Sequence, residues 1–199
     1  MAKGSSDVIL RDRLQFEIDT NGNTQLVYGR IDLSDYVSIV ENRGLAIKEI
    51  RFMLRNPTAG LGNWPTVMLE PHIAGTFFSN LKVFATTTAY EDVTDVGIAS
   101  PNVLCVMEKS TVVYVPDITL PAEDRVPSLW VDSQWYGTPD LHPEGYDVVT
   151  DLLIGISLSN CDLDSLADST CELDIMLIAE PKKITSKDMT QMLTQAQDL

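Results

Sequence analysis

The sequence predicts an all-β protein, an antiparallel sandwich of two sheets with a jelly-roll arrangement, followed by a short C-terminal amphipathic helix. Three observations support this fold class. Residues 171–180 alternate between apolar and polar with a period of two, as one long strand does. About ten extended segments follow one another between turn signals, as in sandwiches. A helical spacing appears only after residue 185.

The closing strands are the most regular part of the pattern. In 171–180, the middle of the second face is also apolar, at Met176 and Ile178. We therefore expect the centre of this strand to be covered on both sides. Residues 147–158 alternate as cleanly and are predicted to form a second long strand. One face of 171–180 is apolar throughout, with Cys171, Leu173, Ile175, Leu177 and Ala179.

The N-terminal part predicts a β-hairpin. Residues 14–18 and 24–31 both alternate, and Asn21-Gly22 between them suits the positive φ angles of a tight turn. The next segment, 31–41, fits either a short helical turn capped at Ser34 or an extended chain. We expect a bent strand there, or a turn followed by a strand.

The next strands are marked by a change of parity and by prolines. In 45–55 the inward parity slips by one residue at Lys48-Glu49, which predicts a β-bulge. After a loop rich in glycine and proline, 67–70 is predicted as a short strand and 81–88 as a longer one, because β-branched residues favour extended backbone.

The middle of the chain predicts another hairpin. Residues 103–107 and 111–115 are apolar and flank the polar triplet Glu108-Lys109-Ser110, so we expect a turn at this triplet. Three prolines then mark an exposed crossing, which leads to a strand at 129–135 and a loop at 137–145.

The tail is the only part with helical spacing. Ser186 is placed to cap a helix, and the apolar residues after it recur every three or four positions. A helix of this length is marginal alone in water, so its apolar stripe must dock, either on its own domain or on a neighbouring subunit or another partner. We divide the chain into a β-sandwich domain at 1–185 and the helix at 186–199. The predicted contact residues are Met189, Met192, Leu193, Ala196 and Leu199.

Composition limits the partners. The chain has 199 residues with 14 basic and 29 acidic side chains, a formal net charge of −15. This charge repels phosphate backbones, so direct nucleic-acid binding is not expected. No run of about 18 apolar residues occurs, so we expect no transmembrane helix. The first residues lack the apolar run of a secretory signal, and export by that route is not expected.

Motifs for catalysis or cofactors are not found, so no enzyme activity, cofactor or metal is expected. Asp140, His142 and Glu144 could share a face if extended, but the flanking prolines favour a turned loop. The acidic loop 162–168 lacks the glycine and the final glutamate of an EF-hand, so a solvated turn is favoured over a Ca²⁺ site. His72 is the other histidine.

The three cysteines have no metal-ligand spacing. Cys161 and Cys171 flank one loop and could pair in an oxidising compartment, but we favour buried thiols for these two and for Cys105.

Some aromatic residues could form a sugar platform. Trp64, Trp135 and Tyr136 are the candidates, with Trp130 nearby in the sequence. Packing in the core or between subunits is the favoured role. Trp130 and Trp135 have opposite parity, so at least one should face the core.

The pattern resembles the single jelly-roll capsid proteins of tailless icosahedral viruses. The resemblance rests on the Asn21-Gly22 hairpin, the bulged strand 45–55, and the closing strand 173–185 before a terminal helix. It spans the whole chain as architecture. It implies a structural subunit of the virion, made in the host cytoplasm, that assembles with itself into trimers or an icosahedral shell and contacts other virion proteins.

One departure from that family bears on the partners. Capsid proteins that touch nucleic acid often carry a basic arm, whereas residues 1–13 hold only Lys3, Arg11 and Arg13 beside two aspartates. The resemblance then implies a shell next to an internal membrane or other proteins, without direct genome contact. The alternative function is a carbohydrate- or ligand-binding β-sandwich module that uses the Trp64, Trp135, Tyr136 and 162–168 sites.

Overall fold

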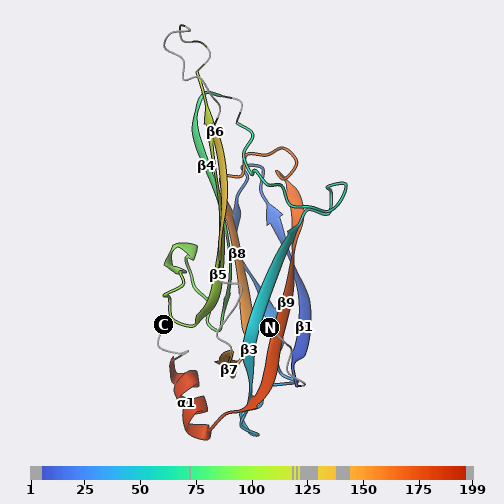
Figure 1. The fold of residues 1–199 in the computed structure, drawn as a ribbon, viewed down its shortest axis with the longest axis vertical. Helices are drawn as coiled ribbons and strands as arrows, with labels where there is room; N and C mark the ends of the chain where they lie inside the picture. The colour runs from blue at the N-terminus through green and yellow to red at the C-terminus, as the bar shows by residue number, and fades with distance from the viewer. Residues whose placement is uncertain are drawn as a thin grey trace.

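The computed structural model describes residues 6–71, 73–117, 119, 121, 130–137 and 144–195, and it shows two antiparallel sheets packed face to face (Figure 1). The elements in chain order are β1 (Val8–Ile18), β2 (Thr24–Ile31), β3 (Arg43–Arg55), β4 (Gly75–Thr86), the 3-10 turn η1 (Val93–Asp95), β5 (Val103–Val115), β6 (Trp130–Gly137), β7 (Tyr146–Val148), β8 (Leu152–Ser159), β9 (Ser169–Lys183) and α1 (Ser186–Gln195).

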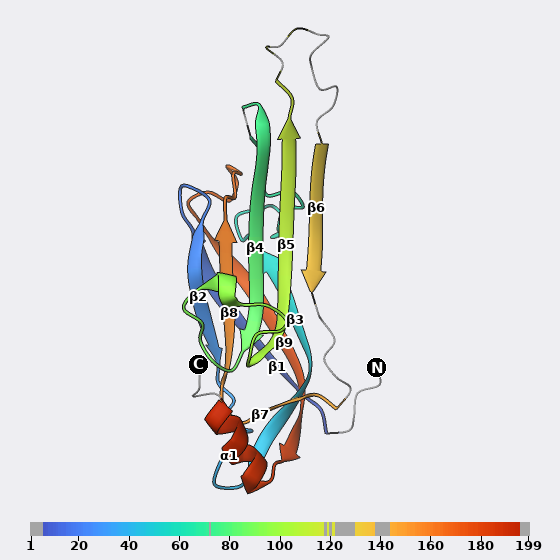
Figure 2. The same cartoon turned by 90° about the vertical axis from the view of Figure 1, so that its left-hand side faces the viewer.

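The strand order is that of a jelly roll. One sheet has the order β1-β9-β3-β7 and the other β2-β8-β4-β5-β6. Successive strands alternate between the two sheets from β1 to β4 and again from β6 to β9 (Figure 2). The predicted antiparallel two-sheet sandwich with a C-terminal helix is therefore confirmed.

The core lies between the sheets, and β9 contributes one full side of it. Its residues from Cys171 to Ala179 at odd positions are buried, as predicted. Met176 and Ile178, which were expected to be covered as well, are only half-buried on the outer face. The β-bulge in β3 is confirmed, because its register with β9 shifts between Ile47 and Glu49.

The N-terminal turn is confirmed, but the hairpin is wrong. Gly22 has a φ of 73° and donates from its N–H to the Asp19 carbonyl at 3.0 Å. A Cβ on Gly22 would also overlap the Cys161 backbone carbonyl. However, β1 pairs with β9 over its whole length, and β2 pairs with β8. Both β1 and β2 pair with long apolar strands from the C-terminal part of the chain, and these strands lie in different sheets. The turn at Gly22 therefore connects one sheet to the other.

The hairpin predicted at residues 108–110 is also wrong, because β5 runs unbroken through it. β5 pairs with β4 from Val103 to Val115, and Lys109 lies opposite Leu81. Lys109 shares the inward parity of Thr111 and Val113, and all three side chains are buried. The polar triplet thus belongs to a continuous strand with a lysine turned into the interior.

The long strand predicted at 147–158 is two strands in different sheets. Val148 at the end of β7 pairs with Leu45, whereas Leu152 at the start of β8 pairs with Ile31. Asp151 fixes the break, because its carboxylate accepts hydrogen bonds from Leu33 N–H at 3.1 Å and from Arg30 Nε at 2.7 Å. Alternation continues across the break because both strands face the same core.

The short strands predicted within 31–41 and at 67–70 are absent, although the turn expected in the first segment is present. Residues 32–42 form turns, with one isolated bridge between Ser38 and Arg43, and Asp32 accepts from the Ser34 N–H at 2.9 Å. Residues 67–70 contribute one bridge, between Leu69 and Asp162. The strand predicted at 81–88 is present as β4 and starts earlier, and β6 confirms the strand predicted at 129–135.

The terminal helix is present, with its cap one residue earlier than predicted. Thr185 Oγ1 accepts from the Asp188 N–H at 3.2 Å and donates to the Asp188 carboxylate at 2.7 Å. Ser186 is the first helical residue. This reciprocal contact satisfies an N–H at the start of α1 that would otherwise lack a partner.

Candidate assembly surfaces

The outer face of the four-stranded sheet carries a cross-strand ion network. Arg13 Nε lies 2.6 Å from Asp174 Oδ1 and its Nη1 lies 3.3 Å from Glu172 Oε2. Arg55, reaching from β3, places its Nη1 3.3 Å from the same Glu172 oxygen. The hydrogen bond that Arg13 donates to the Asp174 carboxylate raises the pKa of Arg13. Two arginines and two carboxylates therefore neutralise each other across three strands.

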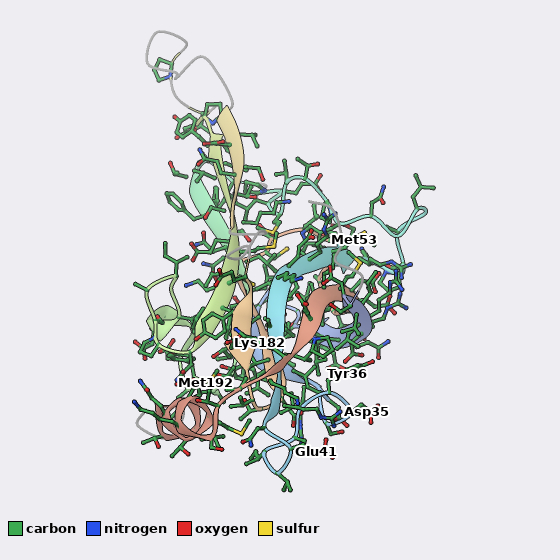
Figure 3. All side chains as sticks on the ribbon, turned by 60° about the horizontal axis from the view of Figure 1, so that its bottom comes forward. Asp35, Tyr36, Glu41, Met53, Lys182 and Met192 are labelled. Atoms are coloured by element: carbon green, nitrogen blue, oxygen red, sulfur yellow. The ribbon has the colours of Figure 1, made fainter. Side chains whose placement is uncertain are left out.

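Beside this network lies a groove of about 770 Å³ with an apolar floor. Met176 on β9 is flanked in register by Arg11 on β1 and Arg51 on β3. Met53, one row along, is 58% exposed (Figure 3). Arg51 pairs with Glu49, whereas Arg11 forms no ion pair or hydrogen bond with the described residues. The groove thus has methionine side chains on its floor and both arginines and carboxylates in its walls.

A second ion cluster fixes the start of β1 to the sheet. Lys48 Nζ lies 2.7 Å from Asp7 Oδ1 and 2.5 Å from Glu180 Oε2. Lys48 holds the pKa of Glu180 below its usual value, and Asp7 with Glu180 raises the pKa of Lys48. The bulge in β3 lies at Lys48 and lets this side chain reach both carboxylates.

The outer face of the five-stranded sheet is covered by the β4–β5 loop, residues 87–102. Lys82 Nζ donates to the Val96 carbonyl at 2.9 Å and to the Val93 carbonyl at 3.3 Å. Val96 is buried against Phe84 and Val106. The loop is therefore fixed to the sheet, and its outer side presents Glu91, Asp95 and Ile98, which is 77% exposed.

At the end of the sandwich that carries α1, the helix docks on its own domain. Met189 is 2% exposed and packs in a small cluster with Val149 and Ile184. Met192 and Leu193 are partly buried against this cluster. Ala196 and Leu199 lie outside the described residues. The predicted role of these five positions in contacting a second subunit stays a prediction.

The turn beside α1 presents apolar residues to solvent. Ile39 is 55% and Val40 94% exposed. Asn42 fixes the turn to the helix start, because its carbonyl accepts from the Ile184 N–H at 2.9 Å and its side chain accepts from Ser186 Oγ at 3.1 Å.

At the opposite end, Trp64 packs against the core. Its ring centroid lies 6.1 Å from that of Phe16, and the residue is half-buried. This geometry agrees with a packing role for Trp64. The side chains of Trp130, Trp135 and Tyr136 lie outside the part of the structure that is described. Exposed apolar residues near this end are Leu61, Ile73 and Phe78.

A buried lysine, which the sequence pattern did not predict, holds the β3–β4 loop. Lys109 is 1% exposed and donates from Nζ to the Pro65 carbonyl at 2.6 Å. Ser133 on β6 donates to the neighbouring Thr66 carbonyl at 2.8 Å. Burial lowers the pKa of Lys109 to about 8. The shared parity of Lys109 and Val113 could have indicated its inward position.

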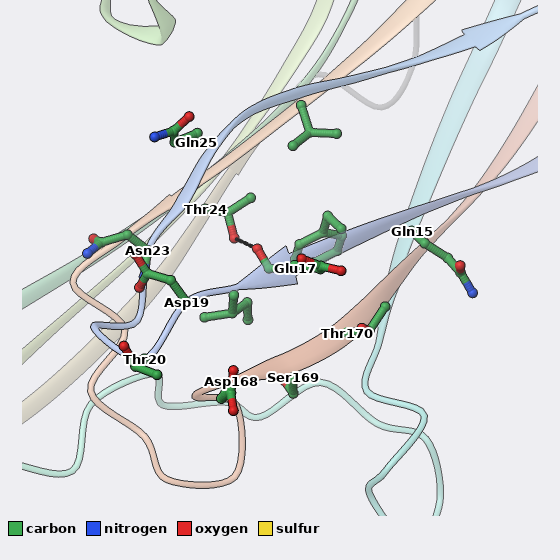
Figure 4. Close-up of a pocket in the computed structure, with 13 residues that line it drawn as sticks. Gln15, Glu17, Asp19, Thr20, Asn23, Thr24, Gln25, Asp168, Ser169 and Thr170 are labelled. Carbon is green, nitrogen blue, oxygen red and sulfur yellow. Dashed lines mark hydrogen bonds between the residues drawn. The ribbon is translucent and has the colours of Figure 1, made fainter.

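A polar cleft of about 820 Å³ opens at the corner between β1 and β2 (Figure 4). Its lining includes Glu17, Asp19 and Asp168, with no basic residue. Asp19 Oδ1 already accepts the N–H groups of Asn21 and Asn23, both at 2.8 Å. The cleft offers hydrogen bonds to a neutral polar ligand and repels an anion.

The residues considered as candidate metal ligands lie partly outside the described residues. His72, Asp140 and His142 lie outside the described residues, and Glu144 is within them. Among the residues with described positions, no cluster of three or more potential metal ligands occurs. In the acidic loop 162–168, the Asp162 carbonyl accepts the Glu70 N–H at 2.5 Å.

Cys105, Cys161 and Cys171 are all buried free thiols. In the described part of the chain, no helix has the length and apolarity needed to cross a membrane.

Comparisons with known proteins give distant structural neighbours. No protein-family model and no curated protein matches the sequence. Among solved structures, Merkel cell polyomavirus VP1 in complex with GD1a oligosaccharide aligns over 93% of this chain and 98% of its own, at 8% identity and a TM-score of 0.35. The unassembled pentamer of the same VP1 gives 8% identity and a TM-score of 0.36 with the same coverage. Apo chimpanzee polyomavirus VP1 gives 9% identity and 0.35, also over 93% and 98%. These neighbours are viral capsid proteins, and such similarity of fold does not by itself define a function.

Proposed function

We propose that this chain is a structural subunit that assembles with copies of itself, as a capsid protein of an icosahedral virion shell. The observation that carries the proposal is the distribution of exposed apolar residues over a rigid sandwich. Val40 lies at one end, Leu61 in the loop at the other, and Met53 and Ile98 on the two outer faces. A subunit that meets neighbours on several sides needs several such surfaces.

The rigidity of the subunit supports the same role. Ion networks tie β1, β9 and β3 together, and Lys82 and Lys109 fix the two longest described loops by hydrogen bonds to backbone carbonyls. Loops that are already ordered lose little conformational entropy when they become part of an interface. Repeated contacts of standard size, about 1,200–2,000 Å² each, can then hold a shell.

The helix α1 is proposed as one of these contact regions. Met189 is buried against its own domain. A contact with a second subunit would therefore use the half-buried Met192 and Leu193 and continue to Ala196 and Leu199. Other virion proteins and the surface of an internal membrane are proposed as further partners. Direct contact with the genome is not proposed, because the net charge of −15 opposes it.

Light scattering of the purified full chain over a range of concentrations tests the proposal. We expect a mass that rises with concentration to trimers or larger closed particles. A constant monomer mass near 22.0 kDa would contradict self-assembly. Truncation after Lys183 should reduce the oligomer mass if α1 bridges subunits, and an unchanged mass would remove the bridging role alone.

A binding module for neutral carbohydrate is the second candidate, and the polar cleft between β1 and β2 favours it. Its carboxylates and amides could bind sugar hydroxyls, although Phe16 in its lining is buried and offers no stacking surface. A neutral oligosaccharide that binds should raise the melting temperature of the chain. The Glu17→Gln variant should lose part of this shift. No shift with any neutral sugar would exclude this candidate.

A further inference from the structure

Two exposed surfaces with complementary chemistry lie on opposite sides of the sandwich. The first is the groove on the outer face of the four-stranded sheet, with Met176 between Arg11 and Arg51. The second is the tip of the β4–β5 loop, residues 91–98, on the outer face of the five-stranded sheet. Figure 1 shows β1 and β9 on one side and this loop, in green, on the other.

The groove differs from the rest of the molecule in its charge. Its walls and the adjoining network hold four arginines and four carboxylates, so this set of charges is neutral in a chain of net charge −15. The ions in this set are Arg11, Arg13, Arg51, Arg55, Asp12, Glu49, Glu172 and Asp174. Arg13 and Arg55 are occupied by Glu172 and Asp174, whereas Arg11 stays without a partner among the described residues.

The loop tip has the opposite character. Glu91 and Asp95 are exposed and form no salt bridge with the described residues, and Ile98 is 77% exposed beside them. Residues 87–102 contain no lysine or arginine. Hydrogen bonds from Ser100 Oγ to the Asp95 carbonyl, at 2.6 Å, and from Gly97 N–H to Ser100 Oγ, at 2.8 Å, fix the tip. The loop is an apolar projection between carboxylates, already ordered.

We propose that the groove of one subunit binds the 91–98 loop tip of a second copy of this chain. Ile98 would lie on the floor formed by Met53 and Met176, and the carboxylates of Glu91 and Asp95 would face Arg11 and Arg51. Charge complementarity favours a second copy as the occupant of the groove. Its acidic loop tip is repelled by a chain of net charge −15 in general and is attracted to the arginines of the groove, where carboxylates do not outnumber basic side chains. This inference rests on the proposed function, and it names the surfaces that self-assembly uses.

The placement of the two surfaces defines the type of contact. Because they differ and lie on opposite sides, each subunit uses its groove for one neighbour and its loop for another. Such a heterologous contact builds a ring if the rotation closes and an open filament if it does not, and each end of a filament keeps one of the two surfaces free. An isologous dimer would instead pair one surface with itself.

Charge reversal on each surface, alone and combined, tests the pairing. The groove variant Arg11→Glu/Arg51→Glu changes the formal charge from −15 to about −19, and the loop variant Glu91→Lys/Asp95→Lys changes it to about −11, since each reversal shifts charge by two. We expect both variants to weaken self-association by about tenfold or more, measured by sedimentation equilibrium. Because net charge moves in opposite directions, a shared loss cannot come from general repulsion.

Two rescue experiments complete the test. An equimolar mixture of the groove and loop variants pairs each surface with its complement, and the fourfold variant restores the pairing within one chain. Both should recover association, while melting temperatures check that every variant folds. Should the reversed groove variant not fold, the neutral pair Arg11→Gln/Arg51→Gln replaces it, and should the reversed loop variant not fold, Glu91→Gln/Asp95→Asn replaces it; either neutral pair should give a smaller loss.

The outcomes separate this inference from the proposed function. A wild-type chain that stays monomeric contradicts both. A wild-type chain that assembles, with reversed variants that assemble equally well, overturns the groove–loop contact and leaves the structural role in place. Loss in both single-surface variants without recovery in the mixture and in the fourfold variant also overturns the pairing.

Discussion

Lys109 donates from its ammonium group to the carbonyl oxygen of Pro65 at a distance of 2.6 Å, inside the sandwich. The lysine belongs to the central part of β5, and Pro65 belongs to the connection from β3 to β4. The contact therefore fixes the β3–β4 loop to the inner face of the five-stranded sheet. A buried charged group costs free energy, and this cost depends on whether the amine carries its proton.

Stability should rise with pH above 8 because of this lysine. Burial lowers its pKa from 10.5 to about 8, so between these values the unfolded chain binds a proton that the folded chain does not. The free energy of unfolding should then increase by up to about 1.4 kcal/mol per pH unit from this group. Urea unfolding of the wild type and of Lys109→Met at several pH values isolates the contribution as a difference. Parallel pH profiles for the two proteins would show that the lysine is not buried as described.

Gly155 should tolerate no side chain. A Cβ at this position in β8 would overlap the ring of Phe84, which is itself fully buried. Gly155→Ala should therefore destabilise the fold by about 1–3 kcal/mol through overpacking. Gly60→Ala is the matched control, because a Cβ added at this position would have nothing within 4 Å, and it should be nearly neutral. Equal effects of the two substitutions on chemical denaturation would contradict the packing of β8 against Phe84.

The cap of α1 should be Thr185 and not Ser186. Thr185→Ala removes the acceptor for the Asp188 N–H and should cost about 1 kcal/mol, with faster hydrogen exchange in the helix. Ser186→Ala removes one exposed contact to Asn42 and should cost less than about 0.5 kcal/mol. If Ser186→Ala lowers the free energy of unfolding more than Thr185→Ala does, the helix cap is Ser186, as predicted from the sequence, and not Thr185.

The three thiols should be unreactive in the folded protein. Burial raises the pKa of Cys105 and Cys161 to about 12, and it raises that of Cys171 as well. The reactive thiolate is then scarce at pH 8. Titration with a disulfide reagent should detect no rapid thiol in the native state and three in guanidinium. A rapidly reacting thiol in the native protein would contradict this.

Features that depend only on neighbouring residues in the chain could be predicted from the sequence. The inward side of β9, the bulge at Lys48-Glu49 and the turn at Gly22 each follow from alternation or from a special backbone angle. Partner choice could not be predicted in this way. Residues 14–18 and 24–31 look like two arms of one hairpin, yet each pairs with a strand more than a hundred residues later.

Two other errors share a physical origin, which is that local polarity was read as exposure. Lys109 looked like a turn residue because its charge is ordinarily solvated, but a backbone carbonyl of a distant loop satisfies it. Asp151 lies within the alternation at 147–158 that predicted one long strand, but it marks the break between β7 and β8 by accepting the Leu33 N–H. The groove at Met176 was missed for a different reason, because its arginines come from strands whose pairing was unknown.

Electron microscopy of the purified full-length chain tests self-assembly most directly. We predict closed particles or rings of uniform size, built from repeats of one elongated sandwich. A field of isolated subunits at every concentration, matched by a sedimenting mass near 22.0 kDa, would contradict a structural role in a shell.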